Sequence, residues 1–370
     1  MNREFYFKLT DQSLSGAVLE QGICRQILGS PDIDIFPLLN AAYEIRKKYF
    51  GKAVSIHIIN NAQNGYCPED CHYCSQAKSS TADIVEYPLK PDAEILAEAK
   101  QAYESGAFRY CMVFAGRGPS HRRTEHLAKL IREIKAQYPI EVCVSAGLLD
   151  QEKAQVLKDA GLDRLNHNLN TSEANYPNIC TTHTFADRLN TLKAARKAGL
   201  EVCSGMILGM GEDNEDVIEV AKKLREVKAR SIPINLLVPI EGTTLKNRPD
   251  LSPEYGLRVL CLFRFLNPDA EIRIAAGREI HLRGLEVLSF YPANSLFLDG
   301  YLNARGSSRV KTLQMIRDAG FTINSEVDLD DLLRSETGQA AEDKERMLKN
   351  LRDLRPFMEK SVRSTAQKCG

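Results

Sequence analysis

The sequence predicts an α/β protein folded as a (β/α)₈ barrel of the TIM type, because apolar runs alternate with helical segments along most of the chain. Four helical segments end in a glycine that precedes an apolar residue, at Gly106, Gly161, Gly199 and Gly320. Glycine just beyond a helix supplies the left-handed conformation that closes its last turn. Helix, glycine and strand in this order are typical of stacked βα units. The chain of 370 residues is also long enough for a barrel, which needs about 250 residues.

Eight runs rich in β-branched or aromatic residues are the predicted strands. They cover residues 54–60, 108–114, 140–146, 162–169, 200–208, 232–238, 271–276 and 294–299. The segments between them have helical periodicity. In residues 120–137, one face carries Leu127, Leu130, Ile131 and Ile134, and Ser120 is a candidate N-cap. An open parallel sheet with helices on both sides is the alternative arrangement of these elements.

Three parts of the chain are expected. Residues 1–50 form a helical lead-in with one amphipathic helix around IFPLLNAAYEIRKKYF, and residues 51–324 form the barrel. Residues 325–370 are highly charged and form a helical, partly flexible C-terminal extension.

Composition argues against several classes of protein. Lys plus Arg and Asp plus Glu number 49 each, and a neutral chain without a basic stripe is not a dedicated nucleic-acid binder. The N-terminal MNREFYFKLTDQ lacks the layout of a signal peptide, and no apolar run approaches the ~20 residues of a membrane span. We therefore expect a cytoplasmic protein without a disulfide framework. Outside the motifs below, Cys24, Cys180 and Cys261 are expected to be small buried residues.

Three cysteines crowd into the segment NGYCPEDCHYCSQ at residues 64–76, namely Cys67, Cys71 and Cys74. A structural zinc site usually has four ligands, and zinc remains an alternative here. Iron–sulfur clusters are held by cysteine thiolates, and three thiolates leave one iron open to a small molecule. In the loop after the first strand, these residues would lie at the C-terminal mouth of the barrel, where barrel enzymes carry out their chemistry.

The spacing CxxxCxxC, with the aromatic Tyr73 before the last cysteine, resembles the signature of the radical S-adenosylmethionine (AdoMet) superfamily. The resemblance implies a [4Fe-4S] cluster whose open iron binds the amino and carboxylate groups of AdoMet. One electron from the cluster would then cleave AdoMet to methionine and a 5′-deoxyadenosyl radical.

Three further cysteines, Cys111, Cys143 and Cys203, each lie inside a predicted strand. Side chains from different barrel strands converge on the axis, so these thiols could hold a second cluster. Three packed core cysteines are the alternative.

Five segments in order along residues 50–300 together resemble the biotin synthase family. They are CPEDCHYCSQ, NHNLNTS at 166–172, CSGMILGMGE at 203–212, PINLLV at 233–238 and IRIAAGRE at 272–279. The resemblance implies a sulfurtransferase that inserts sulfur between C6 and C9 of dethiobiotin to form biotin. The rivals are another radical AdoMet barrel enzyme, of the hydrogenase-maturation or methylornithine-synthase type, and a non-enzymatic metal- or RNA-binding protein.

The resemblance also implies roles for individual residues. The [4Fe-4S] ligands would be Cys67, Cys71 and Cys74, and the ligands of a sulfur-donating auxiliary cluster, a [2Fe-2S], would be Cys111, Cys143, Cys203 and Arg273. The first three and Arg273 are the expected catalytic residues. Tyr73 and Ile207 would line the AdoMet pocket, Arg188 would pair with the AdoMet carboxylate, and Asn168 would contact both AdoMet ribose and substrate. Asn166 and Asn235 would bind the ureido ring of dethiobiotin.

Two stretches depart from the family pattern. Asn170 stands where family members have an aspartate, and VFAGRGPSH after Cys111 replaces a stretch of small residues. The family further implies flavodoxin or ferredoxin as electron donor and a homodimer. The roles of Cys180 and Cys369 stay open, and these spare cysteines leave a different kind of auxiliary cluster as an alternative to [2Fe-2S].

Overall fold

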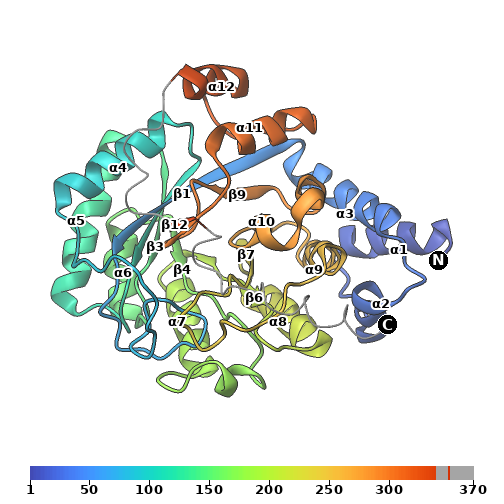
Figure 1. Cartoon of the computed structure of the whole chain (residues 1–370), viewed down its shortest axis with the longest axis horizontal. Helices are drawn as coiled ribbons and strands as arrows, with labels where there is room; N and C mark the ends of the chain where they lie inside the picture. Colours follow the sequence, from blue (N-terminus) through green and yellow to red (C-terminus); the bar gives the residue numbers. More distant parts are fainter. Residues whose placement is uncertain (339–348, 351–370) are drawn as a thin grey trace, which may run out of the picture.

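The computed structural model of the chain describes residues 1–338 and 349–350 (Figure 1). Its centre is a parallel barrel that closes because β1 (Ala53–Gln63) pairs with both β2 and β9. The other barrel strands are β2 (Arg109–Phe114), β3 (Glu141–Ser145), β4 (Arg164–Asn166), β5 (Glu201–Cys203), β6 (Met206–Leu208), β7 (Ser231–Leu236), β8 (Glu271–Ile274) and β9 (Ser295–Leu298). The predicted (β/α)₈ barrel is thus confirmed, and the closed ring rules out an open sheet.

Helices on the outside of the barrel connect its strands. They are α4 (Asp92–Glu104), α5 (His121–Gln137), α6 (Gln151–Asp159), the 3₁₀ turn η1 (Tyr176–Asn178), α7 (Phe185–Lys197), α8 (Asn214–Glu226), α9 (Pro253–Leu266), α10 (Arg278–His281) and the 3₁₀ helix η2 (Arg283–Phe290). The four predicted helix-ending glycines have positive φ, between 71° and 92°. Ser120 caps α5 as predicted, accepting a hydrogen bond from the Arg123 N–H at 3.2 Å.

The first 50 residues form three helices, so the prediction of a single helix there was wrong. Before α3 (Ile35–Phe50) come α1 (Arg3–Leu14) and α2 (Gln21–Gly29). Helix α1 has no clear apolar face in the sequence, because it buries only three side chains, one of them a serine. These helices lie against α8 and α9 on one side of the barrel (Figure 1).

The predicted strand 200–208 is broken into β5 and β6 at Ser204 and Gly205. Gly205 donates its N–H to Asn168 Oδ1 at 3.1 Å and accepts from the Asn170 N–H at 3.0 Å. A Cβ on Gly205 would lie 1.8 Å from the Pro233 carbonyl oxygen. The chain is therefore bent here by groups from β7 and from the segment after β4 that the local sequence does not reveal.

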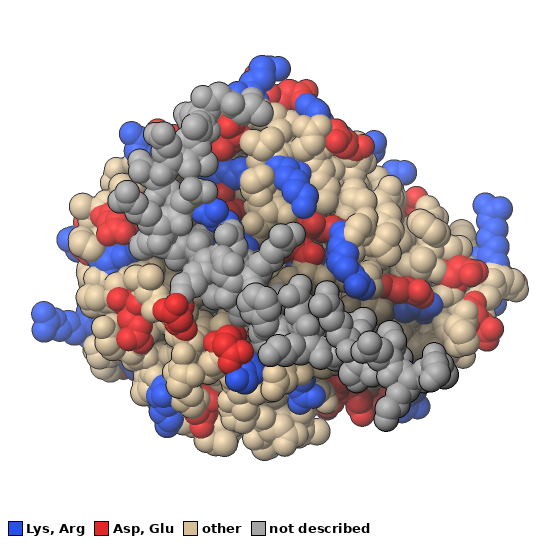
Figure 2. Space-filling model, viewed as in Figure 1, with Lys and Arg blue, Asp and Glu red and all other residues tan. Residues whose placement is uncertain are grey.

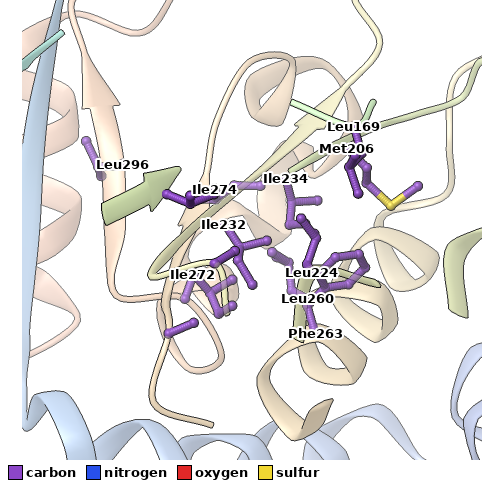
Figure 3. Close-up of a cluster of buried hydrophobic side chains, with 14 of the residues drawn as sticks. Leu169, Met206, Leu224, Ile232, Ile234, Leu260, Phe263, Ile272, Ile274 and Leu296 are labelled. Atoms are coloured by element: carbon purple, nitrogen blue, oxygen red, sulfur yellow. The ribbon is translucent and has the colours of Figure 1, made fainter. Parts of the chain in front are cut away.

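Alternation along the strands separates an outer apolar layer from the barrel interior. Ile232 and Ile234 of β7 point outward, as do Ile272 and Ile274 of β8, and they pack against α8 and α9 (Figure 3). The helices contribute Leu224, Leu260 and Phe263 to the same cluster. The intervening positions of these strands, among them Ser231 and Arg273, face the axis, where they contact each other. This layer holds the inward residues at fixed heights in the barrel.

After the barrel, the described chain continues through β10 (Ala304–Arg305), α11 (Arg309–Asp318), β11 (Thr322–Ile323), α12 (Leu329–Gly338) and β12 (Lys349–Asn350). β11 adds to β1 outside the closed ring. The helix predicted beyond residue 325 is present as α12, whereas Cys369 and most of the predicted extension lie outside the described residues. The three-part division at 50 and 324 stays a prediction.

Basic and acidic side chains are interspersed on the face shown in Figure 2, in keeping with the balanced charge of the chain. Within the described ranges, none of the helices has the length and apolar character to cross a membrane. All nine cysteines in those ranges are free thiols.

Replacing Gly277 with alanine is expected to destabilise the protein by about 2 to 4 kcal/mol. Gly277 caps α10 with φ +80°, and a Cβ there would lie 2.1 Å from the Leu236 carbonyl oxygen. The measurement is the free energy of unfolding in urea. Gly284→Ala is the matched control, because a Cβ at Gly284 meets nothing within 4 Å. Equal stabilities for the two variants would contradict this account of the turn.

Candidate active site

The carboxyl ends of the barrel strands bring the predicted site residues together in layers. Because strand residues rise about 3.3 Å each, inward side chains two positions apart lie about 6 to 7 Å apart along the axis. Arg273 of β8 is paired in register with Pro233 of β7, so Asn235 lies one layer above Arg273. The loop with Cys67, Cys71 and Cys74 follows the carboxyl end of β1 and so begins at this same end of the barrel.

Cys111, Cys143 and Cys203 form the lower layer. Cys111 and Cys143 are direct partners across β2 and β3, and all three side chains pack in one buried cluster with Ala275 and Phe297. Hydrogen bonds from the Cys143 thiol lower the pKa of Cys111 and of Cys203, while the same bonds raise the pKa of Cys143. Three inward thiols from separate strands thus converge on the axis, as the sequence predicted.

Arg273 completes this layer. Its Nη1 lies 3.9 Å from Cys203 Sγ, its Nη2 donates to Ser231 Oγ at 2.7 Å and to Glu271, and only 1% of the residue is exposed. Its buried Nε has no partner among the described residues, although an unsatisfied buried donor costs about 1 to 3 kcal/mol. An unsatisfied donor beside these thiols suits an iron–sulfur cluster, whose sulfides accept hydrogen bonds. A protonated guanidinium has no lone pair, so ligation of a metal by Arg273 would first require the loss of a proton.

A network of buried charges that the sequence analysis missed supports Arg273 from below. Glu271 accepts from Arg109 Nη1 at 3.0 Å and from Arg273, and His57 Nε2 lies 3.0 Å from the same carboxylate. Burial raises the pKa of Glu271, but Arg109, His57 and Arg273 outweigh it and hold that pKa well below its ordinary value. Burial and Arg273 lower the pKa of His57, which keeps the ring neutral. Glu271 is therefore the anion that Arg109 and Arg273 share, and Arg109 has a second carboxylate partner in Glu141 at 2.6 Å.

The triplet loop offers backbone donors to its own sulfur atoms. Backbone N–H groups of Glu69 and Gly116 point at the Cys67 sulfur, and burial nevertheless raises the pKa of this thiol. Cys74 has the N–H groups of Gln76 and Ala77, and burial raises its pKa to about 11. Such N–H groups stabilise thiolates, so the residues present fit the predicted cluster.

Tyr73 and Ile207 lie in one small apolar cluster with Ile179, Met210 and Leu237. The Asn170 side chain donates to the Tyr73 hydroxyl at 2.6 Å, with Asn170 held at φ +70°. The two residues predicted to line the AdoMet pocket therefore share a wall of the mouth.

Arg188, on α7, reaches into this region. It donates from Nη1 to the Asn168 carbonyl at 2.8 Å, from Nη2 to His183 Nε2 at 2.8 Å, and from Nε to the Tyr176 hydroxyl. A guanidinium has five N–H donors, so two remain for a carboxylate.

Of the predicted substrate residues, Asn166 lies beside the cysteine layer as the register partner of Cys203, and Asn235 lies one layer above Arg273. Asn166 Nδ2 is 3.2 Å from Cys203 Sγ and 3.3 Å from Asn168 Oδ1. Asn166 and Asn168 line the same axial cavity, of about 40 Å³, as Cys111, Cys143 and Arg273. Asn235 is outside this lining and donates to the Met206 carbonyl at 3.2 Å. Tyr301, which also lines the cavity, was not singled out from the sequence.

Comparison with known proteins agrees with this geometry. Residues 64–224 match the model of the Radical SAM superfamily, and residues 233–322 match the Biotin and Thiamin Synthesis associated domain. The chain is 56% identical to biotin synthase of Magnetococcus marinus, over 85% of this chain and 98% of that protein. It is 55% identical to biotin synthase of Acaryochloris marina, over 85% and 91% of the two chains. The chain belongs to the biotin synthase family.

Two solved structures of other proteins share the fold. Methylornithine synthase superposes with a TM-score of 0.74 at 21% identity, covering 87% of this chain and 98% of that one. The [FeFe]-hydrogenase maturase HydG of Carboxydothermus hydrogenoformans superposes with a TM-score of 0.73 at 18% identity, covering 88% of this chain and 81% of that one. These likenesses show the fold alone, whereas the high identity to the biotin synthase family favours that activity over the two rival types. The chain is accordingly an enzyme, a radical AdoMet sulfurtransferase.

The cysteines outside the family motif differ in their surroundings. Cys24 and Cys261 are fully buried, as predicted. Cys180 is also buried, but its sulfur lies among polar groups of Asp70, Cys71 and His183 instead of apolar side chains. Nothing in the local sequence of Cys180 indicates these contacts, because Cys71 is 109 positions away.

Proposed function

We propose that this enzyme inserts sulfur between C6 and C9 of dethiobiotin to form biotin, with the sulfur taken from an auxiliary cluster at Cys111, Cys143, Cys203 and Arg273. The observation that carries the proposal is the convergence of three strand thiols and a buried arginine beside two asparagines, Asn166 and Asn168, that line the same axial cavity. A packed apolar core would not place an arginine with an unsatisfied Nε among them.

Two bound groups supply the chemistry: a [4Fe-4S] cluster with AdoMet gives a 5′-deoxyadenosyl radical, and an auxiliary [2Fe-2S] cluster gives sulfur. Cys67, Cys71 and Cys74 would hold the first group. Arg188 would direct its two remaining N–H donors to the AdoMet carboxylate, where a planar guanidinium can bind both oxygens.

The asparagines of β4 and β7 would orient the substrate. A ureido ring has one carbonyl acceptor and two N–H donors, and an amide side chain offers both complementary groups. Asn166 Nδ2 already lies 3.2 Å from Cys203 Sγ, so a ring bound there would sit against the sulfur-bearing layer. The apolar wall around Tyr73 and Ile207 would exclude water from the radical.

Asn170 takes the place of the family aspartate in this proposal. Its amide donates to the Tyr73 hydroxyl at 2.6 Å, whereas an aspartate would accept from that hydroxyl. The Tyr73 hydroxyl can accept from an asparagine or donate to an aspartate, so we expect the Tyr73 side chain to occupy the same position with either residue. Flavodoxin or ferredoxin as electron donor, a homodimer and a cytoplasmic location complete the proposal.

The test is an anaerobic assay. The enzyme is reconstituted with iron and sulfide and given AdoMet, dethiobiotin and a reductant, and biotin and 5′-deoxyadenosine are measured by mass spectrometry. We expect biotin, with more than one deoxyadenosine per biotin because two hydrogen atoms must be removed. Deoxyadenosine without biotin would refute the substrate, and neither product would refute the radical chemistry.

A further inference from the structure

A second set of metal-binding side chains lies beside the triplet loop. Cys180, between η1 and α7, has its Sγ 3.8 Å from Cys71 Sγ and 3.3 Å from His183 Nδ1. Ligand atoms of Cys71, Cys180 and His183 all lie within 4.8 Å of one another, and all three residues are buried. Of the three, only Cys71 has a role in the proposed function.

The separations fit one tetrahedral ion. With Zn–S of about 2.3 Å and Zn–N of about 2.0 Å, two tetrahedral sulfur ligands lie about 3.8 Å apart and a sulfur and a nitrogen about 3.5 Å apart. The observed 3.8 Å and 3.3 Å are close to these values. Cysteines of a cubane cluster each bind a different iron, so two sulfur atoms this close are better suited to a single ion.

We propose that the cluster-free chain binds one zinc ion through Cys71, Cys180 and His183, with a fourth position open to water. Because Cys71 cannot serve both metals, zinc and the [4Fe-4S] cluster would exclude each other. The exclusion rests on the proposed role of Cys71, whereas zinc binding itself does not.

The surrounding groups already orient these ligands. Asp70 accepts from the backbone N–H groups of Thr181 and Thr182 and from the Cys180 thiol at 3.3 Å, whose proton would be released when the sulfur binds zinc. His183 Nδ1 contacts Glu69, and its Nε2 accepts from Arg188 at 2.8 Å.

Zinc binding changes the hydrogen bonds of His183. Nδ1 would give up its contact with Glu69, and the ring proton would move to Nε2. Arg188 would then keep its bonds to Tyr176 and Asn168 and lose the one to His183. The ion would therefore also disturb the side chain proposed to bind the AdoMet carboxylate.

The first test uses the full-length wild-type chain after anaerobic removal of its clusters. One equivalent of Zn²⁺ is added, the thiols are alkylated with iodoacetamide, and peptides are quantified by mass spectrometry over time. We expect Zn²⁺ to slow alkylation of Cys71 and Cys180 by at least about tenfold, because a metal-bound thiolate is a poor nucleophile, and to leave Cys67 and Cys74 unchanged. If Zn²⁺ slowed the alkylation of all four cysteines equally, or did not slow that of Cys180, the proposed zinc site would be refuted.

The second test uses Co²⁺ as a spectroscopic probe of tetrahedral thiolate coordination. The auxiliary thiols also bind cobalt, so the result is the difference between wild type and Cys180→Ser. We expect this variant to bind one ion fewer per chain, while Cys261→Ser, a buried cysteine in the apolar packing of α9, binds as wild type does. Equal stoichiometry for Cys180→Ser would refute the proposal, and the alkylation test stands if the variant does not fold.

The exclusion is tested by cluster reconstitution. Zn²⁺-loaded wild type should assemble the [4Fe-4S] cluster at least about tenfold more slowly than metal-free protein, whereas Cys180→Ser should be insensitive to Zn²⁺. Equal sensitivity of the variant would refute the exclusion. Biotin formation by cluster-loaded wild type reports on the proposed function separately.

Discussion

Replacing Cys143 with alanine is expected to abolish biotin formation while AdoMet cleavage continues. Cys143 is the middle thiol of the auxiliary layer, in contact with both Cys111 and Cys203. Loss of a group that only supports a metal ligand costs about 10- to 100-fold in activity or affinity, so loss of a proposed ligand should reduce biotin by at least about a hundredfold. The triplet loop lies outside this layer, so deoxyadenosine should still form.

The measurement is the yield of both products from reconstituted variant and wild type. Cys261→Ala is the matched control, since it also removes a buried cysteine from the core but lies on α9, in the outer apolar layer. Its biotin yield should equal that of wild type. If Cys143→Ala still makes biotin, sulfur does not come from this site.

The barrel was predictable because apolar runs alternate with helical segments and because capping residues and glycines mark the ends of the helices. Apart from β1 the strands are short, most strands that are adjacent in sequence pair in the ring, and Ser120 and Gly106 mark helix ends by purely local chemistry. The break at Gly205 was not predictable, because it depends on the Asn168 side chain, from the segment after β4, and on the Pro233 carbonyl of β7. Helices α1 and α2 were missed because their buried faces are narrow.

The site was predictable to the extent that its residues belong to recognisable motifs. The buried charge network below the site could have been predicted from strand alternation. Glu271 is two positions before Arg273, and Arg109 is two positions before Cys111, so Glu271 and Arg109 lie on the inward face of their strands. The pairing of Cys71 with Cys180 had no such signal, because it joins two loops and no periodicity connects them.

Replacing Glu271 with glutamine should destabilise the protein by about 3 to 5 kcal/mol, because it leaves the buried guanidinium of Arg273 without a counter-charge, whereas Arg109 keeps its ion pair with Glu141. Glu271 is nearly inaccessible and balances Arg109 and Arg273, which are themselves buried. Glu201→Gln is the matched control: Glu201 pairs at 3.0 Å with Arg164, at the edge of the same network, but its side chain is 48% exposed. An exposed pair contributes about 0 to 1 kcal/mol, so this control should lie close to wild type.

The difference in unfolding free energy between wild type and Glu271→Gln should depend on pH. This dependence distinguishes the loss of the Glu271 charge from a loss of packing. The pKa of Glu271 is depressed in the folded protein, so its ionised form stabilises the fold above the ordinary value of 4.5, and this contribution is lost as pH falls from there toward the folded pKa. The stability gap between wild type and Glu271→Gln, measured by urea unfolding, should therefore be constant near neutral pH and shrink below about 4.5. A gap of unchanged size in acid would mean that Glu271 acts by its shape and hydrogen bonds alone. In that case the buried carboxylate is not what holds Arg273 against the three thiols.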